Sequence, residues 1–126
     1  MNSPYIIAEI GSNCFHSEDM TANFDTAIAQ VVAASKCGAD AAKFQFFTAE
    51  ELWGPMSRGK DFAAQLDLYA LPEHWMRELS HVCAEMGIDF MCSAFSVEGF
   101  RKVDHFVKMH KLASSEITAT DMVRWL

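Results

Sequence analysis

Four short apolar segments of this sequence carry polar residues of types that could do chemistry. Glu9 lies in the first segment, Lys43 and Gln45 in the second, Ser93 in the third and Lys111 in the fourth. Enzymes built from alternating strands and helices hold anionic substrates at the carboxyl ends of their parallel strands. Two ammonium groups, an amide and a hydroxyl suit an anion, and a carboxylate suits proton transfer, so these residues together predict one site.

Lys43 and Gln45 are two positions apart, so the alternation of side chains along a strand places both on one face. Lys43 would then contact a phosphate or carboxylate group, and Gln45 would donate a hydrogen bond. A strand end at which the lysine simply reaches solvent explains the pair equally well. Glu9 is more informative, because a carboxylate inside an apolar strand is unfavourable unless it is paired or binds something. We expect it to transfer protons or to hold sugar hydroxyls, with an ion pair to a neighbouring lysine as the alternative.

The densest polar cluster begins at Lys111 and ends at Glu116. Ser114 and Glu116 are expected in the loop beyond the end of the strand. Serine hydroxyls and backbone amides suit a phosphate group, and a glutamate suits general-base chemistry. Taken alone, this cluster is explained more simply as a polar loop before a helix, and Ser93 as a turn residue.

Composition argues against several classes of protein. The chain has 126 residues, 51% of them hydrophobic, and a formal net charge of −7, so neither disorder nor general binding of nucleic acid is expected. No apolar run approaches the roughly 18 residues of a membrane span, and the first residues lack the basic region of a signal peptide. The histidines and cysteines show no spacing typical of metal ligands. We therefore expect no metal ligands in this chain, and reduced thiols in a cytoplasmic protein.

Hydrophobic patterning predicts alternating strands and helices. Strands are expected at residues 5–10, 41–47, 88–92 and 109–113, and helices at 24–37, 72–87, 97–108 and from 119. Residues 48–71 are expected to be largely irregular, with a short helix near 61–69. This order predicts an α/β fold in which helices pack outside a parallel sheet. An open flavodoxin-like sheet and half of an eight-stranded barrel both fit the pattern.

Particular residues mark the expected ends of the helices. Gly38 would close the first helix in the left-handed conformation, and Gly87 would end the second. Ser96 is a suitable N-cap, and residues 118–121 (TATD) have the pattern of a capping box. The sequence stops inside the last helix, which favours a polypeptide that once continued.

Four segments in order carry a resemblance to a known family: residues 6–13 (IIAEIGSN), 38–45 (GADAAKFQ), 90–95 (FMCSAF) and 111–117 (KLASSEI). They resemble the N-terminal part of the sialic acid synthase family, which includes N-acetylneuraminate, legionaminate and pseudaminate synthases. The resemblance implies the N-terminal half, about four βα units, of a TIM-type (β/α)8 barrel. Residues 1–126 would be a single incomplete barrel domain, without the C-terminal half-barrel and the antifreeze-like domain of the family.

The resemblance also implies a reaction. Family members are transferases that condense phosphoenolpyruvate with an N-acetylmannosamine-type sugar to give a nonulosonic acid and phosphate, in sialic acid biosynthesis. They require a divalent metal ion, manganese or magnesium, whose histidine ligands lie further along the family's chain. The residues matching phosphoenolpyruvate contacts are Lys43, Gln45, Ser93, Lys111 and Ser114. Glu9 and Glu116 match family acids close to the reacting carbons and are the expected catalytic residues.

The sequence departs from the family pattern at three places. Cys14 stands where a histidine is usual, Ser93-Ala94 where Thr-Pro is common, and Ser115 where a glycine is usual, which predicts a strained tight turn. The missing later motifs leave two main alternatives. One is a homodimeric synthase of which this chain is a fragment with little turnover of its own. The other is a non-catalytic truncated remnant or a self-associating half-barrel; a different phosphoenolpyruvate-using aldolase is a third possibility.

Overall fold

The computed structural model describes residues 3–54 and 60–126 and shows a parallel sheet with the strand order β1-β2-β3-β4 in this part of the chain. The strands are β1 (Ile7–Gly11), β2 (Ala41–Phe46), β3 (Asp89–Ala94) and β4 (Lys111–Leu112). Each strand pairs in parallel with the next strand along the chain. A helical crossover therefore joins each neighbouring pair, as the alternating sequence pattern predicted.

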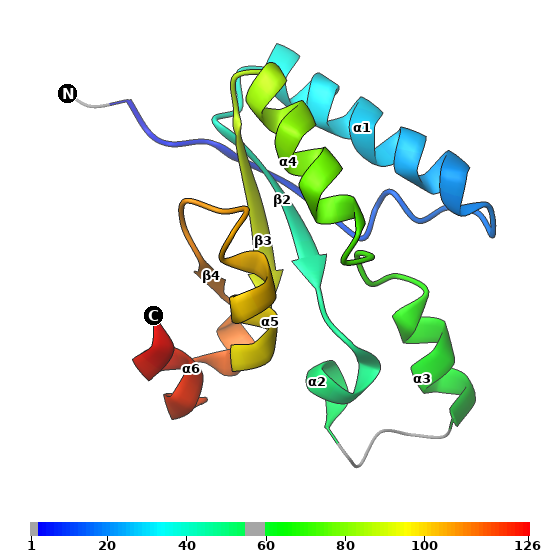
Figure 1. Cartoon of the computed structure of the whole chain (residues 1–126), viewed down its shortest axis with the longest axis vertical. Helices are drawn as coiled ribbons and strands as arrows, with labels where there is room; N and C mark the ends of the chain where they lie inside the picture. Colours follow the sequence, from blue (N-terminus) through cyan, green and yellow to red (C-terminus); the bar gives the residue numbers. More distant parts are fainter. Residues whose placement is uncertain (1–2, 55–59) are drawn as a thin grey trace.

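The helices lie on one side of the sheet and beyond its carboxyl end (Figure 1). They are α1 (Met20–Lys36), α2 (Ala49–Trp53), α3 (Lys60–Asp67), α4 (Trp75–Glu85), α5 (Val97–Val103) and α6 (Thr120–Trp125), with a 3-10 turn at Ser114–Glu116. Helices α1 and α4 run side by side across the sheet, and α5 packs against β3. The short helices α2 and α3 follow the end of β2 and contact each other. No helix in residues 3–54 or 60–126 combines the length and the apolar character needed to cross a membrane.

One face of the sheet forms the hydrophobic core with these helices. Phe44 of β2 and Phe90 of β3 stack with ring centroids 5.8 Å apart on this face. Val31, Leu79 and Phe100, from α1, α4 and α5, are fully buried against it. Each such side chain contributes on the order of 1.5–3 kcal/mol through removal of apolar surface from water. The near-continuous apolar strands are therefore explained by burial beneath the helices.

Two predicted helix starts were wrong. Helix α1 begins at Met20 rather than at residue 24, because the Asp19 carboxylate accepts hydrogen bonds from the backbone amides of Thr21 and Ala22 and caps the helix. The apolar periodicity gave no sign of this first turn. Helix α4 begins at Trp75 rather than at Pro72, because a turn closed by a bond from the amide of Trp75 to the carbonyl of Pro72 precedes it.

The structure confirms some of the predicted helix ends and contradicts others. Gly38 has a φ of 84°, which confirms the left-handed helix end, and Ser96 caps α5 by accepting from the amide of Gly99 at 2.8 Å. The capping box at residues 118–121 was wrong, because the N-cap of α6 is Ala119 and no side chain caps it. The strain predicted at Ser115 is absent too, since no non-glycine residue in the described ranges has a positive φ.

Other element boundaries also changed. Helix α5 ends at Val103 rather than at residue 108, and β4 comprises Lys111–Leu112 only. Residues 48–71 are less irregular than predicted, because α2 begins at a capping box of Thr48 and Glu51. Helix α3 agrees with the short helix expected near residues 61–69. The predicted irregular stretch at residues 55–59 lies outside the described residues.

Candidate anion-binding site at the carboxyl ends of the strands

A buried lysine lies at the centre of the sheet face opposite the helices. Lys43 of β2 is 4% exposed, and its ammonium group lies 2.7 Å from a carboxylate oxygen of Glu9 and 3.1 Å from the hydroxyl oxygen of Ser93. The strand register explains these contacts, because Glu9 pairs with Lys43, and Ser93 is two residues beyond the partner of Lys43 on β3. Three of the residues singled out from sequence are thus in direct contact.

The ion pair is unequal in its exposure to solvent. The side chain of Lys43 is 5% exposed, whereas that of Glu9 is 61% exposed. Burying an ammonium group is unfavourable unless an opposite charge and hydrogen bonds compensate. Glu9 provides the charge from the outer strand of the sheet and remains largely hydrated. The buried carboxylate expected at Glu9 was therefore wrong, because this part of β1 is open to solvent on that face.

Ser93 connects the buried lysine to the next strand. Its hydroxyl oxygen accepts a hydrogen bond from Lys43, so its own hydrogen stays available to donate to an anion. Ser93 also pairs in register with Lys111 of β4. The ammonium group of Lys111 is half-buried, donates to the carbonyl of Leu112 at 2.6 Å and has no acidic partner within residues 3–54 and 60–126. In the part of the chain that the structure describes, a cation without an acidic partner therefore lies on β4, separated from Lys43 on β2 by strand β3.

Gln45 lies close to the turn that ends β1. It pairs in register with Ser93, which confirms that it shares a face with Lys43. The sheet register shifts between Glu9 and Gly11, and Gly11 has a φ of 58°. A Cβ at Gly11 would lie 3.5 Å from the side-chain nitrogen of Gln45, so the backbone of the turn approaches the amide closely. The left-handed conformation explains why a glycine stands here.

Ser114 and Glu116, the remaining two predicted residues, have no recorded contact with the cluster around Lys43 in the described part of the chain. Ser114 and Glu116 lie in the 3-10 turn that directly follows β4, and the backbone of Glu116 bonds to the carbonyl of Ala113 at 3.0 Å. Ser114 is exposed and Glu116 is half-buried. The expectation that they lie beyond the end of the strand is confirmed, and their contact with a ligand stays a prediction.

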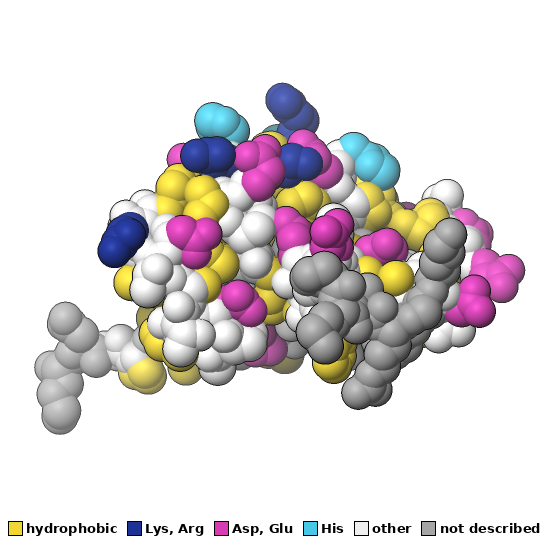
Figure 2. Space-filling view, turned by 90° about the horizontal axis from the view of Figure 1, so that it is seen from below, with side chains coloured by type: hydrophobic (Ala, Val, Ile, Leu, Met, Phe, Trp, Pro, Cys, Tyr) yellow, Lys and Arg dark blue, Asp and Glu magenta, His cyan; other side chains and the backbone are white. Residues whose placement is uncertain are grey.

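Figure 2 shows the molecule from below the view of Figure 1. This is the end of the molecule toward which the carboxyl ends of β2 and β3 point. Acidic side chains are spread across the middle of this face, and basic and histidine side chains gather along one edge.

A cavity of about 560 Å³ lies near the rim but contains none of the predicted site residues. Its lining residues come from the loop before α1, the first residue of α1 and the two residues that follow α3: Phe15, His16, Ser17, Glu18, Met20, Leu68 and Tyr69. The ring of His16 is held by the hydroxyl of Thr26 at 2.7 Å. The described lining residues include neither a lysine nor an arginine, whereas the cluster around Lys43 contains a buried ammonium group.

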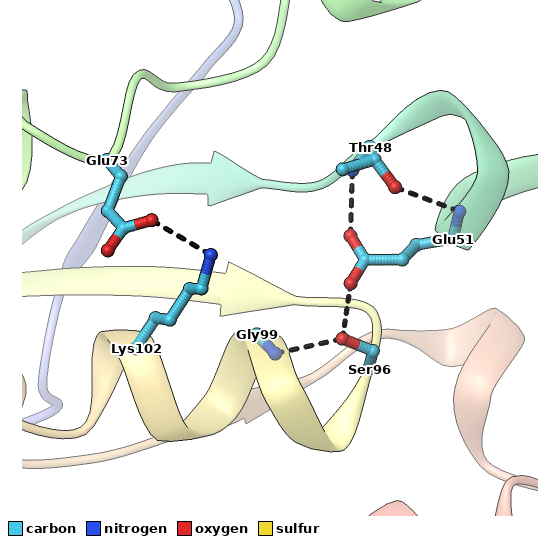
Figure 3. Close-up of polar contacts among 6 residues, drawn as sticks. All are labelled: Thr48, Glu51, Glu73, Ser96, Gly99 and Lys102. Atoms are coloured by element: carbon cyan, nitrogen blue, oxygen red, sulfur yellow. Dashed lines mark hydrogen bonds and ion pairs between the residues drawn. The ribbon is translucent and has the colours of Figure 1, made fainter.

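Sequence analysis missed one polar network at this end of the sheet. Glu51 of α2 closes a capping box with Thr48 and also accepts a hydrogen bond from the hydroxyl of Ser96 (Figure 3). The spacing Thr-x-x-Glu is a recognisable signal for the start of α2. No sequence signal predicts the bond to Ser96, because it joins residues from different βα units.

The described residues do not form a metal centre. No group of three or more His, Cys, Asp or Glu side chains within residues 3–54 and 60–126 is arranged to hold a metal ion. Burial raises the pKa of the Cys92 thiol, next to Ser93, despite the nearby charge of Lys43. The divalent ion that the resemblance implies has no ligand set among these residues.

Several solved structures are similar to this chain, among them the two that follow. One is the N-acetylneuraminic acid (sialic acid) synthetase of Leptospira borgpetersenii serovar Hardjo-bovis in complex with citrate, with 23% identity and a TM-score of 0.83; the match covers 98% of this chain and 41% of that one. The other is the spore coat polysaccharide biosynthesis protein spsE of Bacillus subtilis, with 26% identity and a TM-score of 0.74; it covers 96% of this chain and 32% of that one. The chain thus spans less than half the length of either structure. No match was found among curated protein sequences.

The likeness to the synthetase confirms the predicted fold, the N-terminal half of a TIM-type (β/α)8 barrel. The sequence pattern of the NeuB family matches residues 30–126. That range begins after β1, so Glu9 lies outside it. The site residues inside it are Lys43, Gln45, Ser93, Lys111, Ser114 and Glu116. Since the match extends over much more than half of the sequence, the chain belongs to the NeuB family.

Proposed function

We propose that this chain forms the phosphoenolpyruvate-binding part of a sialic acid synthase-type active site. The reaction condenses phosphoenolpyruvate with an N-acetylmannosamine-type sugar and gives a nonulosonic acid and phosphate. One observation carries the proposal: in a chain of the NeuB family, a buried ammonium group lies at the carboxyl ends of the strands, in contact with a carboxylate and a hydroxyl.

The arrangement of charges supports the binding of an anion. Lys43 on β2 and Lys111 on β4 lie on the two strands that flank Ser93 on β3, and Lys111 has no acidic partner in the described part of the chain. One lysine would hold the carboxylate and the other the phosphate of phosphoenolpyruvate. Ser93 would donate its free hydroxyl hydrogen, and Ser114, at the start of the 3-10 turn, would add a second hydroxyl. Gln45 would donate an amide hydrogen bond next to Lys43.

The two glutamates have the chemistry needed for the proton transfers. In the proposed reaction, C3 of phosphoenolpyruvate forms a bond to the aldehyde carbon of the sugar, whose oxygen takes up a proton. Water adds at C2, and the C2–O bond to phosphate then breaks and releases phosphate. Glu9, close to Lys43, and Glu116, after β4, would accept the proton from water and deliver one to the aldehyde oxygen.

We propose that a complete active site of this type requires a divalent metal ion. Its ligands would have to come from outside residues 3–54 and 60–126, and none of the steps above is assigned to it. We therefore expect the 126-residue chain to bind phosphoenolpyruvate without turning it over. In a complete synthase, which we expect to be a homodimer, the ion would polarise the sugar aldehyde. Four free cysteines support the proposal that the chain is cytoplasmic.

Calorimetric titration of the 126-residue chain with phosphoenolpyruvate tests this function directly. We expect saturable binding that weakens with rising salt concentration, because the contacts are ionic. Titration with lactate, a singly charged carboxylate, is the matched control and should give far weaker binding. Absence of phosphoenolpyruvate binding to the folded chain would refute the proposal. Manganese-dependent release of phosphate from phosphoenolpyruvate and N-acetylmannosamine would instead refute the expected lack of turnover.

Self-association is a second candidate, favoured by the apolar outer surface of β1. Ile6 and Ile7 are 49% and 37% exposed, and β1 is an edge of the described sheet. Such an edge offers unpaired backbone groups to another chain. Sedimentation equilibrium distinguishes the candidates: a monomer that binds phosphoenolpyruvate supports the site alone, and a stable dimer that binds none supports self-association.

A further inference from the structure

A single carboxylate joins the segments that follow β2 and β3. One oxygen of Glu51 accepts from the backbone amide of Thr48 at 2.8 Å, and the other accepts from the hydroxyl of Ser96 (Figure 3). The hydroxyl of Thr48 accepts in return from the amide of Glu51 at 3.2 Å, and that of Ser96 accepts from the amide of Gly99 at 2.8 Å. The carboxylate thus holds the N-caps of α2 and α5 together.

These two N-caps stand in equivalent places relative to the candidate anion site. Gln45 and Ser93 face each other in the register of β2 and β3. Thr48 follows Gln45, and Ser96 follows Ser93, by the same number of residues. The bond from Glu51 therefore ties the two chain segments together just after they leave the paired part of the sheet.

Packing next to the bridge limits how the two segments can move. The rings of Phe47 and Phe95 meet edge to face, with centroids 5.8 Å apart, between the site residues and the N-caps. Apolar contacts of this kind set a separation but allow sliding, whereas hydrogen bonds are directional. The Glu51 bridge adds a directional polar contact between these two segments.

We propose that Glu51 is a positioning residue, which fixes the spacing between Gln45 and Ser93 by joining the N-caps of α2 and α5. It touches no part of the expected ligand and acts through Thr48 and Ser96. The expected effect on phosphoenolpyruvate binding rests on the proposed function. The spacing between Gln45 and Ser93 can be tested without a ligand.

The chemistry of the bridge selects the variants. In Glu51→Gln the amide oxygen can still accept from the amide of Thr48, but the amide nitrogen only donates. This nitrogen can meet Ser96 only through a reversed, uncharged bond to a hydroxyl oxygen that already accepts from Gly99, so Glu51→Gln weakens the bridge and Ser96→Ala removes it. Glu50 provides the control, because it lies in the same first turn of α2, is exposed and has no recorded side-chain contact. Glu50→Gln removes the same charge from the same turn. Ser96→Thr keeps the hydroxyl, and Ser96→Ala removes it.

Nuclear magnetic resonance of the ligand-free chain tests the spacing, after circular dichroism has shown that each variant is folded. We expect Glu51→Gln and Ser96→Ala to shift the backbone amide signal of Ser93 and the side-chain amide signals of Gln45. Glu50→Gln and Ser96→Thr should leave these signals in place. Unchanged signals in folded Ser96→Ala, which lacks the bridging hydroxyl, would overturn the proposal, whether or not the chain binds phosphoenolpyruvate.

Phosphoenolpyruvate titrations then test the consequence for binding. We expect about a fivefold rise in Kd for Glu51→Gln and for Ser96→Ala, a size typical of substitutions that act at a distance. The double variant should bind no more weakly than Ser96→Ala, because both substitutions act on the same link. A wild-type Kd in folded Ser96→Ala, or effects that multiply in the double variant, would reject the positioning role. If the wild-type chain binds no phosphoenolpyruvate, the proposed function fails, and the ligand-free spectra alone decide this inference.

Discussion

Replacing Lys43 with methionine separates the two roles that a buried lysine can have, binding a ligand and supporting the fold. Methionine has a similar length and is apolar, so it fills the same space without the charge. The substitution removes the ion pair to Glu9 and the hydrogen bond to Ser93. It leaves the opposite face of β2, with Phe44 in the hydrophobic core, unchanged.

The structure gives a different magnitude for each role. A hydrogen bond to a charged group contributes about 1.5–3 kcal/mol, so loss of the Lys43 contact should weaken phosphoenolpyruvate binding about tenfold to a hundredfold. Stability should change little, because replacing a buried charge with an apolar group of similar volume is often neutral or stabilising. The orphaned carboxylate of Glu9 is not a large penalty, since its side chain is 61% exposed and remains hydrated. We expect the free energy of unfolding to stay within about 2 kcal/mol of wild type.

Two measurements on the same protein check these magnitudes. Calorimetry gives the Kd for phosphoenolpyruvate, and urea unfolding followed by circular dichroism gives the free energy of unfolding. Lys36→Met is the matched control, because Lys36 is an exposed lysine in the last turn of α1, outside the site. The control should leave both quantities near wild type.

Either of two results would refute this reasoning about Lys43. An unchanged Kd in folded Lys43→Met would show that the ammonium group does not contact the ligand. A loss of much more than about 3 kcal/mol of stability, the cost of breaking a buried ion pair, would show that Glu9 depends on this lysine despite its exposure.

Three further predictions concern other parts of the molecule. The first concerns Asp89, whose pKa is lowered by hydrogen bonds from Lys108 and, to a lesser extent, from Tyr5. The ionised carboxylate therefore stabilises the fold at pH values above the pKa that Asp89 has in the unfolded chain. This stabilisation is lost as the pH falls through the pKa that Asp89 has in the folded chain. The free energies of unfolding of wild type and Asp89→Asn, measured in urea, should differ near pH 7 and become similar near about pH 2. The same difference in free energy at the two pH values would contradict this prediction. Gly99→Ala should lower the free energy of unfolding by about 1–3 kcal/mol in urea, because the new Cβ would lie 3.0 Å from that of Ala94; wild-type stability would argue against the close contact. Of the four thiols only Cys37 is exposed, so Ellman's reagent should modify one thiol rapidly in the native chain and four in denaturant; two rapid reactions would contradict the burial.

Sequence patterning predicted the sheet more accurately than the helix ends. Strand β2, expected at residues 41–47, is Ala41–Phe46, because a strand buried beneath helices needs a continuous apolar run that is visible in the sequence. The start of α1 was missed because the buried residue of its first turn, Asn23, is polar. Its side-chain oxygen accepts from the amides of His16 and Ser17, both at 3.1 Å, which makes burial favourable.

Sequence reasoning likewise predicted one part of the candidate site and missed another. The shared face of Lys43 and Gln45 follows from alternation along one strand, and the structure confirms it. The exposure of Glu9 and the bridge between Glu51 and Ser96 could not be predicted, because each depends on which strand or helix lies alongside.

The sequence by itself determined the alternation of strands and helices, apart from α2, and the four polar strand ends, since local periodicity and single residue types are sufficient to predict them. Only the tertiary structure decided that β1 brings Glu9 to Lys43, that Ser93 stands between two lysines, and that one carboxylate joins two helix N-caps. The physical reason is that ion pairs and hydrogen bonds depend on separations of about 3 Å between atoms far apart in the chain. The register of neighbouring strands sets those separations, and register is a property of the assembled sheet.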